Sequence, residues 1–224
     1  MKAGSECGSV IVSLRETPVS HREQLKQLLR EKSLWRGKFL LSSGKTSDYY
    51  IDCKLTTLDP EGAALAAYTI LELLDEKGIQ ADAIGGPVLG AVPIVAAVAA
   101  VSYLRAKVER KGMPLPAFLV RKEPKGHGRQ KQIEGLDLTK VHKVVIVDEV
   151  CTEGTSIEVA LQVVEENKLE VVAVISLVDR EQGGHEKLRE KYGDRYLQVF
   201  TARELLQDDA RVLAHSPEAS QHIL

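Results

Sequence analysis

One segment constrains the fold more than any other, an unbroken apolar run at Lys143–Val147 that leads into two acidic residues and a short loop. A strand without polar alternation is typical of a sheet that is buried on both faces. An amphipathic helix is predicted next, over 156–167, and a second apolar run follows at Val171–Val178. Because parallel strands need a long crossover between them, this strand–helix–strand order predicts a parallel sheet covered by helices.

The rest of the chain repeats this alternation. Further strands are expected at 81–86 and 117–121, and helices at 20–32, 59–77 and 88–108. A pair of short strands, 39–41 and 49–51, should flank a Ser-Ser-Gly-Lys turn. The segment 123–136 holds Pro, three glycines and basic residues without an apolar period, so it is interpreted as a mobile loop. The predicted fold class is α/β, with a five-stranded parallel sheet flanked by helices.

Composition excludes several other classes. The 224 residues suit one domain, with at most a small appendage. Thirty basic and 32 acidic residues give a net charge of −2, so no nucleic acid and no anionic membrane is expected as a partner. The apolar stretch 83–104 contains two prolines and is rich in Ala, which favours a buried strand and helix over a membrane span. Three widely spaced cysteines and a polar N-terminus without a secretory pattern predict a reducing, cytoplasmic location.

The chemistry should lie where the buried strands end, because ligands bind at the carboxyl ends of parallel strands. The sequence after Val147 is Asp-Glu-Val-Cys-Thr-Glu-Gly-Thr-Ser. Backbone N–H groups at such a turn and helix start suit a phosphate, and the acids suit ribose hydroxyls or hydrated Mg²⁺. A plain strand–turn–helix with Ser156 as the helix cap is the alternative. No Gly-Lys-Ser/Thr is present, so this is not the nucleotide P-loop.

Segment 144–156 resembles the PRPP (5-phosphoribosyl 1-diphosphate) motif of the type I phosphoribosyltransferases. Two further segments resemble one branch of them, the orotate phosphoribosyltransferases: Phe39-Leu-Leu-Ser-Ser-Gly-Lys-Thr-Ser-Asp-Tyr-Tyr-Ile-Asp52 their N-terminal signature, and Arg121-Lys-Glu-Pro-Lys-Gly-His-Gly128 their flexible catalytic loop. Shorter matches at 59–62, 85–90 and 179–181 keep the family's order. Each segment alone is moderately specific, and together they cover roughly residues 39–181.

The resemblance implies the type I phosphoribosyltransferase fold, a central, mostly parallel sheet flanked by helices with a small N-terminal hood. Its expected parts are a hood at 1–54, a PRPP-binding core at 55–206 and a tail of unclear role at 207–224. The implied reaction joins PRPP and orotate to give orotidine 5′-monophosphate and pyrophosphate in UMP biosynthesis. The implied cofactor is Mg²⁺, held by substrate and water rather than by side chains. The implied assembly is a homodimer in which the loop completes the neighbouring site.

The resemblance also assigns residues to PRPP. Asp148 and Glu149 should hold the ribose hydroxyls, and the turn from Thr152 to Ser156 should hold the 5′-phosphate. The catalytic cations on the departing pyrophosphate should come from the loop, Lys125 first. The PRPP-binding set is Asp148, Glu149, Thr152, Glu153, Gly154, Thr155, Ser156, Arg121, Lys122, Lys125 and His127. A solvated basic surface turn is the alternative for the loop.

Orotate should meet Arg180, whose planar guanidinium can bind a carboxylate through two hydrogen bonds. The resemblance adds Tyr50, Ile51 and Thr152 as contacts of the base. Without that context, Arg180 would be a surface ion-pair partner. Tyr50 and Ile51 would be ordinary strand-packing residues.

Several positions depart from the family pattern. The acid pair is Asp-Glu, where Asp-Asp or Glu-Asp is usual, and Ser42 and Gly90 stand where some members carry lysine. Glu153 places a carboxylate in the phosphate turn, which would weaken phosphate binding if its side chain pointed inward and matter little if it pointed to solvent. Two other functions therefore stay open, transfer to another base and PRPP sensing without catalysis.

Overall fold

The structure, a computed structural model, describes residues 19–40, 46–123 and 132–207. Its centre is a six-stranded sheet in the order β5-β4-β3-β6-β7-β8. The strands are β3 (Ala83–Pro87), β4 (Ala117–Val120), β5 (Ile133–Glu134), β6 (Lys143–Cys151), β7 (Glu170–Asp179) and β8 (Tyr196–Thr201). All neighbours pair in parallel except β4 and β5. The predicted α/β class and the mostly parallel sheet are confirmed, but the sheet has six strands rather than the five predicted, because the antiparallel β5 adds to its edge.

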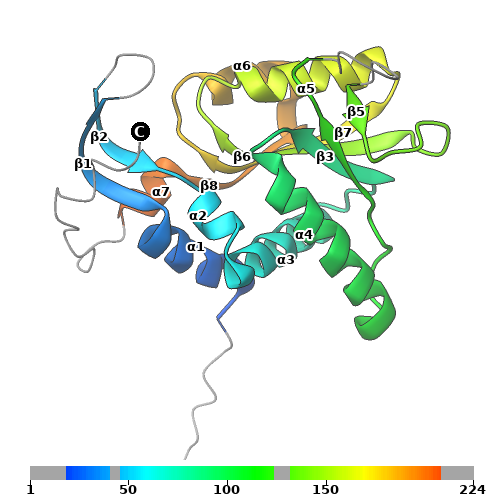
Figure 1. Ribbon diagram of the computed structural model, residues 1–224, viewed down its shortest axis with the longest axis horizontal. Helices are drawn as coiled ribbons and strands as arrows, with labels where there is room; N and C mark the ends of the chain where they lie inside the picture. The colour runs from blue at the N-terminus through cyan, green and yellow to red at the C-terminus, as the bar shows by residue number, and fades with distance from the viewer. Residues whose placement is uncertain (1–18, 41–45, 124–131, 208–224) are drawn as a thin grey trace, which may run out of the picture.

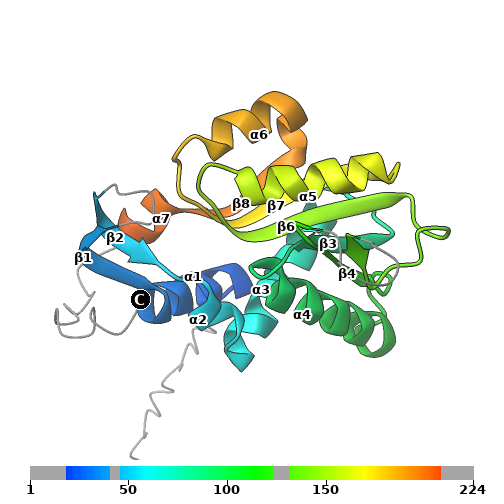
Figure 2. The ribbon, with the colours of Figure 1, turned by 45° about the horizontal axis from the view of Figure 1, so that its top comes forward.

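Helices cover both faces of the sheet (Figures 1 and 2). They are α3 (Pro60–Glu76) and α4 (Ala91–Leu104) on one face, and α5 (Thr155–Glu166) and α6 (Gly184–Tyr192) on the other. Side chains of β6 alternate between the two hydrophobic clusters that result. Val145 and Val147 pack with α3 and α4, whereas Val144 and Ile146 pack with α5 and α6. This alternation explains why the run at 143–147 is apolar throughout.

The N-terminal part forms a separate small layer beside the sheet. It consists of α1 (His21–Lys32), the antiparallel hairpin of β1 (Leu34–Leu40) and β2 (Thr46–Ile51), and the short α2 (Lys54–Thr57). Helix α7 (Ala202–Gln207), from the other end of the described chain, lies against this layer (Figure 1). An ion pair of 2.7 Å between Arg22 and Glu204 joins α1 to α7. Both termini of the described chain therefore support the hairpin.

Two expectations need correction. The segment 123–136 is not loop throughout, because β5 pairs with β4 and buries Ile133 beside Val120. The acids Asp148 and Glu149 do not follow a strand that ends at Val147, since β6 keeps its pairing with β7 as far as Cys151. Strand β1 begins five residues before the predicted strand at 39–41. The other predicted elements begin and end within a few residues of their predicted limits, whereas β8, α2, α6 and α7 had not been predicted.

Close approach of β3 and β6 depends on Gly86. A Cβ atom there would lie 1.9 Å from the carbonyl oxygen of Val147 and 2.7 Å from Cβ of Ala91. The absence of a side chain lets the loop after β3 come down onto the end of β6, where the acid pair lies.

One helical stretch among the described residues, Ala91–Glu109, is long and apolar enough to cross a membrane by length and composition. It comprises α4 and the π-helical turn Arg105–Glu109. Its buried side chains, among them Ile94, Val95 and Val98, belong to the cluster between α3 and the sheet. These contacts are those of a core helix in an α/β fold.

Candidate active site

The chemistry-bearing segments meet at the carboxyl ends of β3, β6 and β7. Neighbouring strands bring the end of β6 beside that of β7, with Cys151 opposite Asp179. The backbone N–H of Arg180 donates to the carbonyl oxygen of Cys151 at 2.8 Å. Gly90, after β3, lies against the acid pair of β6. Residues separated by about 90 positions thus share one edge of the sheet.

The turn after β6 presents uncapped helix N–H groups. Gly154 adopts a left-handed conformation (φ 82°) and is the N-cap of α5, with no side-chain cap. Ser156 is therefore not the cap, which corrects that alternative. Thr155 and Ser156 are exposed in the first turn of α5. Free N–H groups and hydroxyls at a helix N-terminus suit an anion such as phosphate.

Helix α6 supports this turn from outside. The backbone N–H of Gly184 donates to the carbonyl oxygen of Thr152 at 3.0 Å, and the Lys187 ammonium donates to the carbonyl oxygen of Glu153 at 3.4 Å. A Cβ on Gly184 would lie 2.6 Å from the sulfur of Cys151, so α6 packs directly on the turn. Glu153 itself is exposed.

Cys151 lies beneath the same turn and is fully buried. Burial raises the pKa of its thiol to about 11, so the sulfur stays protonated. It acts as a packing residue there.

The two acids of β6 have different surroundings. Asp148 is only 5% exposed and accepts a hydrogen bond of 2.8 Å from the backbone N–H of Glu149. Burial raises the pKa of Asp148 to about 7, and the neighbouring Glu149 carboxylate adds to this effect. Glu149 pairs with Lys54 at 3.0 Å through Oε1. Its Oε2 is buried and has no hydrogen-bond partner among the described residues.

Arg180 carries the second unpaired group. Its Nε and Nη2 are buried without a hydrogen-bond partner in the described part of the chain. Its guanidinium carbon lies 5.0 Å from the ring centre of Tyr49. The neighbouring Asp179 holds the turn that follows, because it accepts from the backbone N–H of Glu181 at 2.7 Å and from the Tyr196 hydroxyl at 2.7 Å. Donors directed by a rigid turn suit a planar anion.

Tyr50 and Ile51 lie on opposite faces of β2. The Tyr50 ring packs against those of Trp35 and Phe39, with ring centres 5.9 Å and 5.6 Å away. Ile51 is buried in the core cluster. In the free protein Tyr50 and Ile51 therefore make ordinary strand-packing contacts, which was the second interpretation of these residues in the sequence. Tyr49, which shares the face of Ile51 and contacts Arg180, had not been selected.

The basic segment after β4 is described in part. Arg121 pairs with Glu134 of β5 at 3.1 Å, and Lys122 is exposed. Lys125 and His127 lie outside the described residues.

Lys54 is the residue that the sequence reasoning missed at the centre of the site. Its ammonium contacts Asp52 at 2.9 Å and Glu149 at 3.0 Å. Partial burial lowers the pKa of Lys54, but these two carboxylates together outweigh that effect and raise the pKa above its usual value. A lysine that follows an Asp at the end of a strand gives little signal in a sequence, because such pairs are usually solvated.

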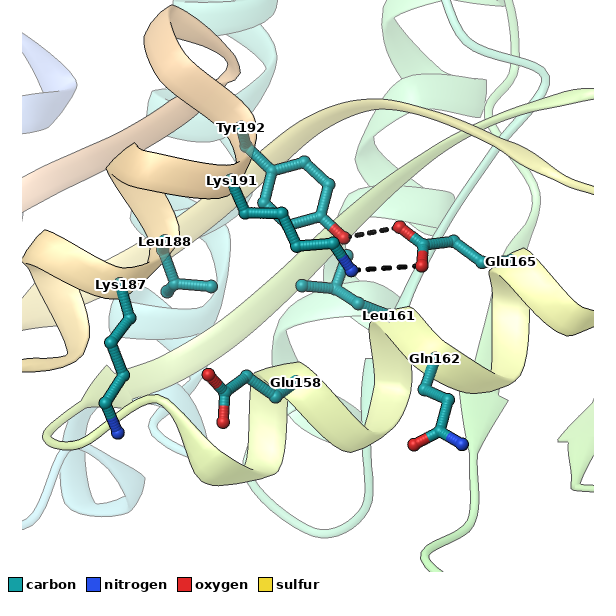
Figure 3. Close-up of a pocket in the computed structure, with 8 residues that line it drawn as sticks. All are labelled: Glu158, Leu161, Gln162, Glu165, Lys187, Leu188, Lys191 and Tyr192. Carbon is teal, nitrogen blue, oxygen red and sulfur yellow. Dashed lines mark hydrogen bonds and ion pairs between the residues drawn. The ribbon is translucent and has the colours of Figure 1, made fainter.

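A pocket of about 300 Å³ lies between α5 and α6, and the acid pair and Arg180 are not among its lining residues (Figure 3). Three of its polar groups pair with one another, since Glu165 accepts from Tyr192 at 2.6 Å and from Lys191 at 3.0 Å. No three His, Cys, Asp or Glu side chains gather as metal ligands within the described ranges.

Comparisons with known proteins agree with this geometry. Residues 57–204 match the phosphoribosyl transferase domain family. Over 188 residues the chain is 43% identical to the orotate phosphoribosyltransferase of Aquifex aeolicus, which spans 83% of the chain and 97% of the relative. It is 41% identical to that of Rhodopseudomonas palustris, with 83% and 96% covered.

Solved structures give the same result. The Mycobacterium tuberculosis orotate phosphoribosyltransferase in complex with PRPP is 32% identical and superimposes with a TM-score of 0.65, over 83% of this chain and 98% of that one. The enzyme from Aeropyrum pernix is 30% identical with a TM-score of 0.62, over 81% and 96%. An adenine phosphoribosyltransferase from Leishmania donovani, 16% identical with a TM-score of 0.55 over 84% and 86%, shares the fold alone.

Proposed function

Because the chain belongs to the orotate phosphoribosyltransferase family, it transfers the 5-phosphoribosyl group of PRPP to orotate, and we propose that the edge formed by β6 and β7 carries out this transfer. The products are orotidine 5′-monophosphate and pyrophosphate, a step of UMP biosynthesis. Transfer to another base and PRPP sensing without catalysis find no support in relatives of this identity.

One observation carries the proposal: two buried groups of complementary chemistry, without partners among the described residues, lie at the ends of adjacent strands. Glu149 Oε2 can accept a hydrogen bond, and Arg180 Nε and Nη2 can donate. PRPP offers ribose hydroxyls, which donate, and orotate offers a carboxylate, which accepts. Buried polar groups are normally paired, so unpaired ones at a strand edge favour a ligand.

On PRPP, the turn from Thr152 to Ser156 binds the 5′-phosphate through its N–H groups and hydroxyls. Glu153 lies in that turn with its side chain exposed. Asp148 and Glu149 bind the ribose hydroxyls. The donor set near them, two carboxylates and no third ligand in the described residues, fits Mg²⁺ held by PRPP oxygens and water. When bound, Mg²⁺ would supply positive charge to offset that of the pyrophosphate.

In the transfer, the bond from ribose C1 to the pyrophosphate oxygen breaks with its electron pair leaving on pyrophosphate. A bond from an orotate ring nitrogen to C1 forms, and the proton of that nitrogen passes to the departing pyrophosphate. Positive character on the ribose faces the acid pair of β6. The charge on the leaving group is stabilised by cations of the loop, Arg121, Lys122, Lys125 and His127. In the free protein Arg121 forms an ion pair with Glu134, so this role requires Arg121 to leave that ion pair.

On orotate, Arg180 binds the carboxylate through two parallel hydrogen bonds, the geometry for which a guanidinium is suited. Thr152 lies beside the base. Of the two hairpin residues that the resemblance assigns to the base, Ile51 shares the face of β2 that carries Tyr49, whereas the Tyr50 ring packs on the opposite face. Tyr49, whose ring packs on the guanidinium, therefore takes the place of Tyr50 on the wall of the base site.

The proposal extends to assembly and location. Residues 1–54 act as a hood, 55–206 as the PRPP-binding core, and 207–224 as a tail without an assigned role. Two copies form a homodimer in which each loop completes the other's site. Two free, buried cysteines, Cys53 and Cys151, suit a reducing cytoplasm. The small negative charge gives no reason for a nucleic-acid or membrane partner.

The test follows orotate by its ultraviolet absorbance with PRPP and Mg²⁺ in the wild type, Lys125→Ala and Lys140→Ala. Lys140 is an exposed lysine paired with Asp137 and serves as the matched control. Turnover that requires Mg²⁺ and falls in Lys125→Ala alone supports the proposal. Full turnover in Lys125→Ala removes Lys125 from the mechanism. PRPP binding without orotate turnover would favour another base or a regulator.

A further inference from the structure

We propose that Lys54 is a positioning residue that holds Glu149 in place for the ribose of PRPP. The inference rests on the proposed function, since it takes Glu149 as a ribose contact. Lys54 acts through Glu149 and is not assigned a contact with substrate.

The two carboxylate oxygens of Glu149 have different surroundings. Its Oε1 accepts from the Lys54 ammonium at 3.0 Å. Its Oε2 is buried and has no partner within the described chain. An ion pair to one oxygen fixes the plane of the carboxylate, so the other oxygen keeps a single direction.

Glu149 needs such a restraint because of its neighbours. Its side chain has more rotatable bonds than an Asp, and it adjoins the buried Asp148 carboxylate. A cation beside Glu149 offsets the repulsion between the two acids. Gly90 provides the space for the longer side chain, because a Cβ atom at position 90 would lie 2.9 Å from Cγ of Glu149.

Lys54 also ties the N-terminal layer to the sheet. It begins α2, directly after the hairpin, and its ammonium contacts Asp52 as well as Glu149. The backbone N–H of Lys54 also donates to the Asp52 carboxylate at 3.1 Å, so Asp52 holds both the backbone and the ammonium of the lysine. Lys54 therefore adds a direct link between the end of the hairpin that carries Tyr49 and the acid pair.

The experiment measures PRPP binding by calorimetry and the KM values for PRPP and orotate. The variants are Lys54→Met, Lys54→Arg, Glu149→Gln and the double variant Lys54→Met/Glu149→Gln, with Lys140→Met as the matched control. Lys54→Met should weaken PRPP binding about tenfold, the size of one lost charge-assisted hydrogen bond. The KM for orotate should change less, and Lys54→Arg should restore most of the affinity.

The double variant decides the mechanism. If Lys54 acts through Glu149, adding Lys54→Met to Glu149→Gln weakens PRPP binding by no more than about twofold, since coupled residues are not additive. A full tenfold loss in both backgrounds would overturn the proposal and make Lys54 an independent contact. Unchanged PRPP binding in Lys54→Met would also overturn it.

Failure of the proposed function gives a different result. If Glu149→Gln alone leaves PRPP binding intact, the ribose contact itself is wrong, whatever Lys54 does. Thermal unfolding of each variant separates loss of folding from loss of binding. Lys54→Gln serves as a second, polar replacement if Lys54→Met unfolds.

Discussion

Replacement of Arg180 by Met should have opposite effects on orotate use and on the stability of the free protein. The guanidinium has two nitrogens, Nε and Nη2, that are buried without a partner in the described residues. A ligand carboxylate would satisfy both. Methionine keeps the apolar stem and removes the charge and the donors.

The two magnitudes follow from this environment. Removing one partner of a buried charge pair costs about 2–5 kcal/mol, which lowers kcat/KM for orotate by about 30-fold to several thousandfold. In the free protein, unpaired buried donors cost about 1–3 kcal/mol each, while the contact with the Tyr49 ring contributes about 0.5–2 kcal/mol. Arg180→Met should therefore stabilise the free protein by about 1–3 kcal/mol, which is about 2–4 °C in Tm for each kcal/mol.

The assay combines orotate kinetics at saturating PRPP with thermal unfolding in the absence of ligands. Arg203→Met is the matched control, because Arg203 is an exposed arginine paired with Glu181 beside the same turn. PRPP affinity should stay within about twofold of the wild type in both variants. A lower Tm for Arg180→Met together with an unchanged KM for orotate would refute the reasoning.

Two further predictions concern the strand edge. Gly86→Ala should destabilise the protein by about 3 kcal/mol or more in urea unfolding, because its Cβ would lie 1.9 Å from the Val147 oxygen. Gly78→Ala, which meets no atom within 4 Å but has a φ of 63°, should cost only about 1 kcal/mol, and equal losses would contradict the argument. Burial raises the pKa of Asp148 from its usual 3.8 to about 7, so the folded state holds a proton that the unfolded state releases. The free energy of unfolding should then fall as the pH rises from about 4 to about 7, and Asp148→Asn should remove that slope; an unchanged slope would place the titration elsewhere.

The sheet could be predicted from the sequence because its strands are buried on both faces. Apolar runs such as Val171–Val178 lack the alternation of apolar and polar residues that marks a surface strand, and the helices between such runs are amphipathic. Strand β8 was missed because Tyr196–Thr201 mixes Tyr, Gln and Thr with apolar residues. The two-residue β5 depends on pairing with β4, which no local pattern records.

The parts of the site that lie within one short segment could be predicted from the sequence. The contacts between residues far apart in the chain could not. The turn from Thr152 to Ser156 is one local unit, so its N–H groups and hydroxyls follow from the order of residues. Lys54 reaches Glu149 across 95 positions, a contact that only the folded chain creates. The choice between Tyr49 and Tyr50 depended on which face of β2 meets Arg180, and adjacent tyrosines are equivalent in a sequence.

Two departures from the family pattern, Glu149 and Gly90, form one arrangement with Lys54 in the folded protein. Glu149 is longer than the usual Asp, and its added length occupies the volume beside Gly90, where a Cβ would lie 2.6 Å from Oδ1 of Asp148. A lysine at position 90 would therefore collide with the acid pair. The cation comes instead from Lys54, which pairs with Glu149 at 3.0 Å. Gly90 provides the space that the longer Glu149 needs, and Lys54 provides the positive charge beside it. The Asp-Glu pair is therefore compatible with a working ribose site.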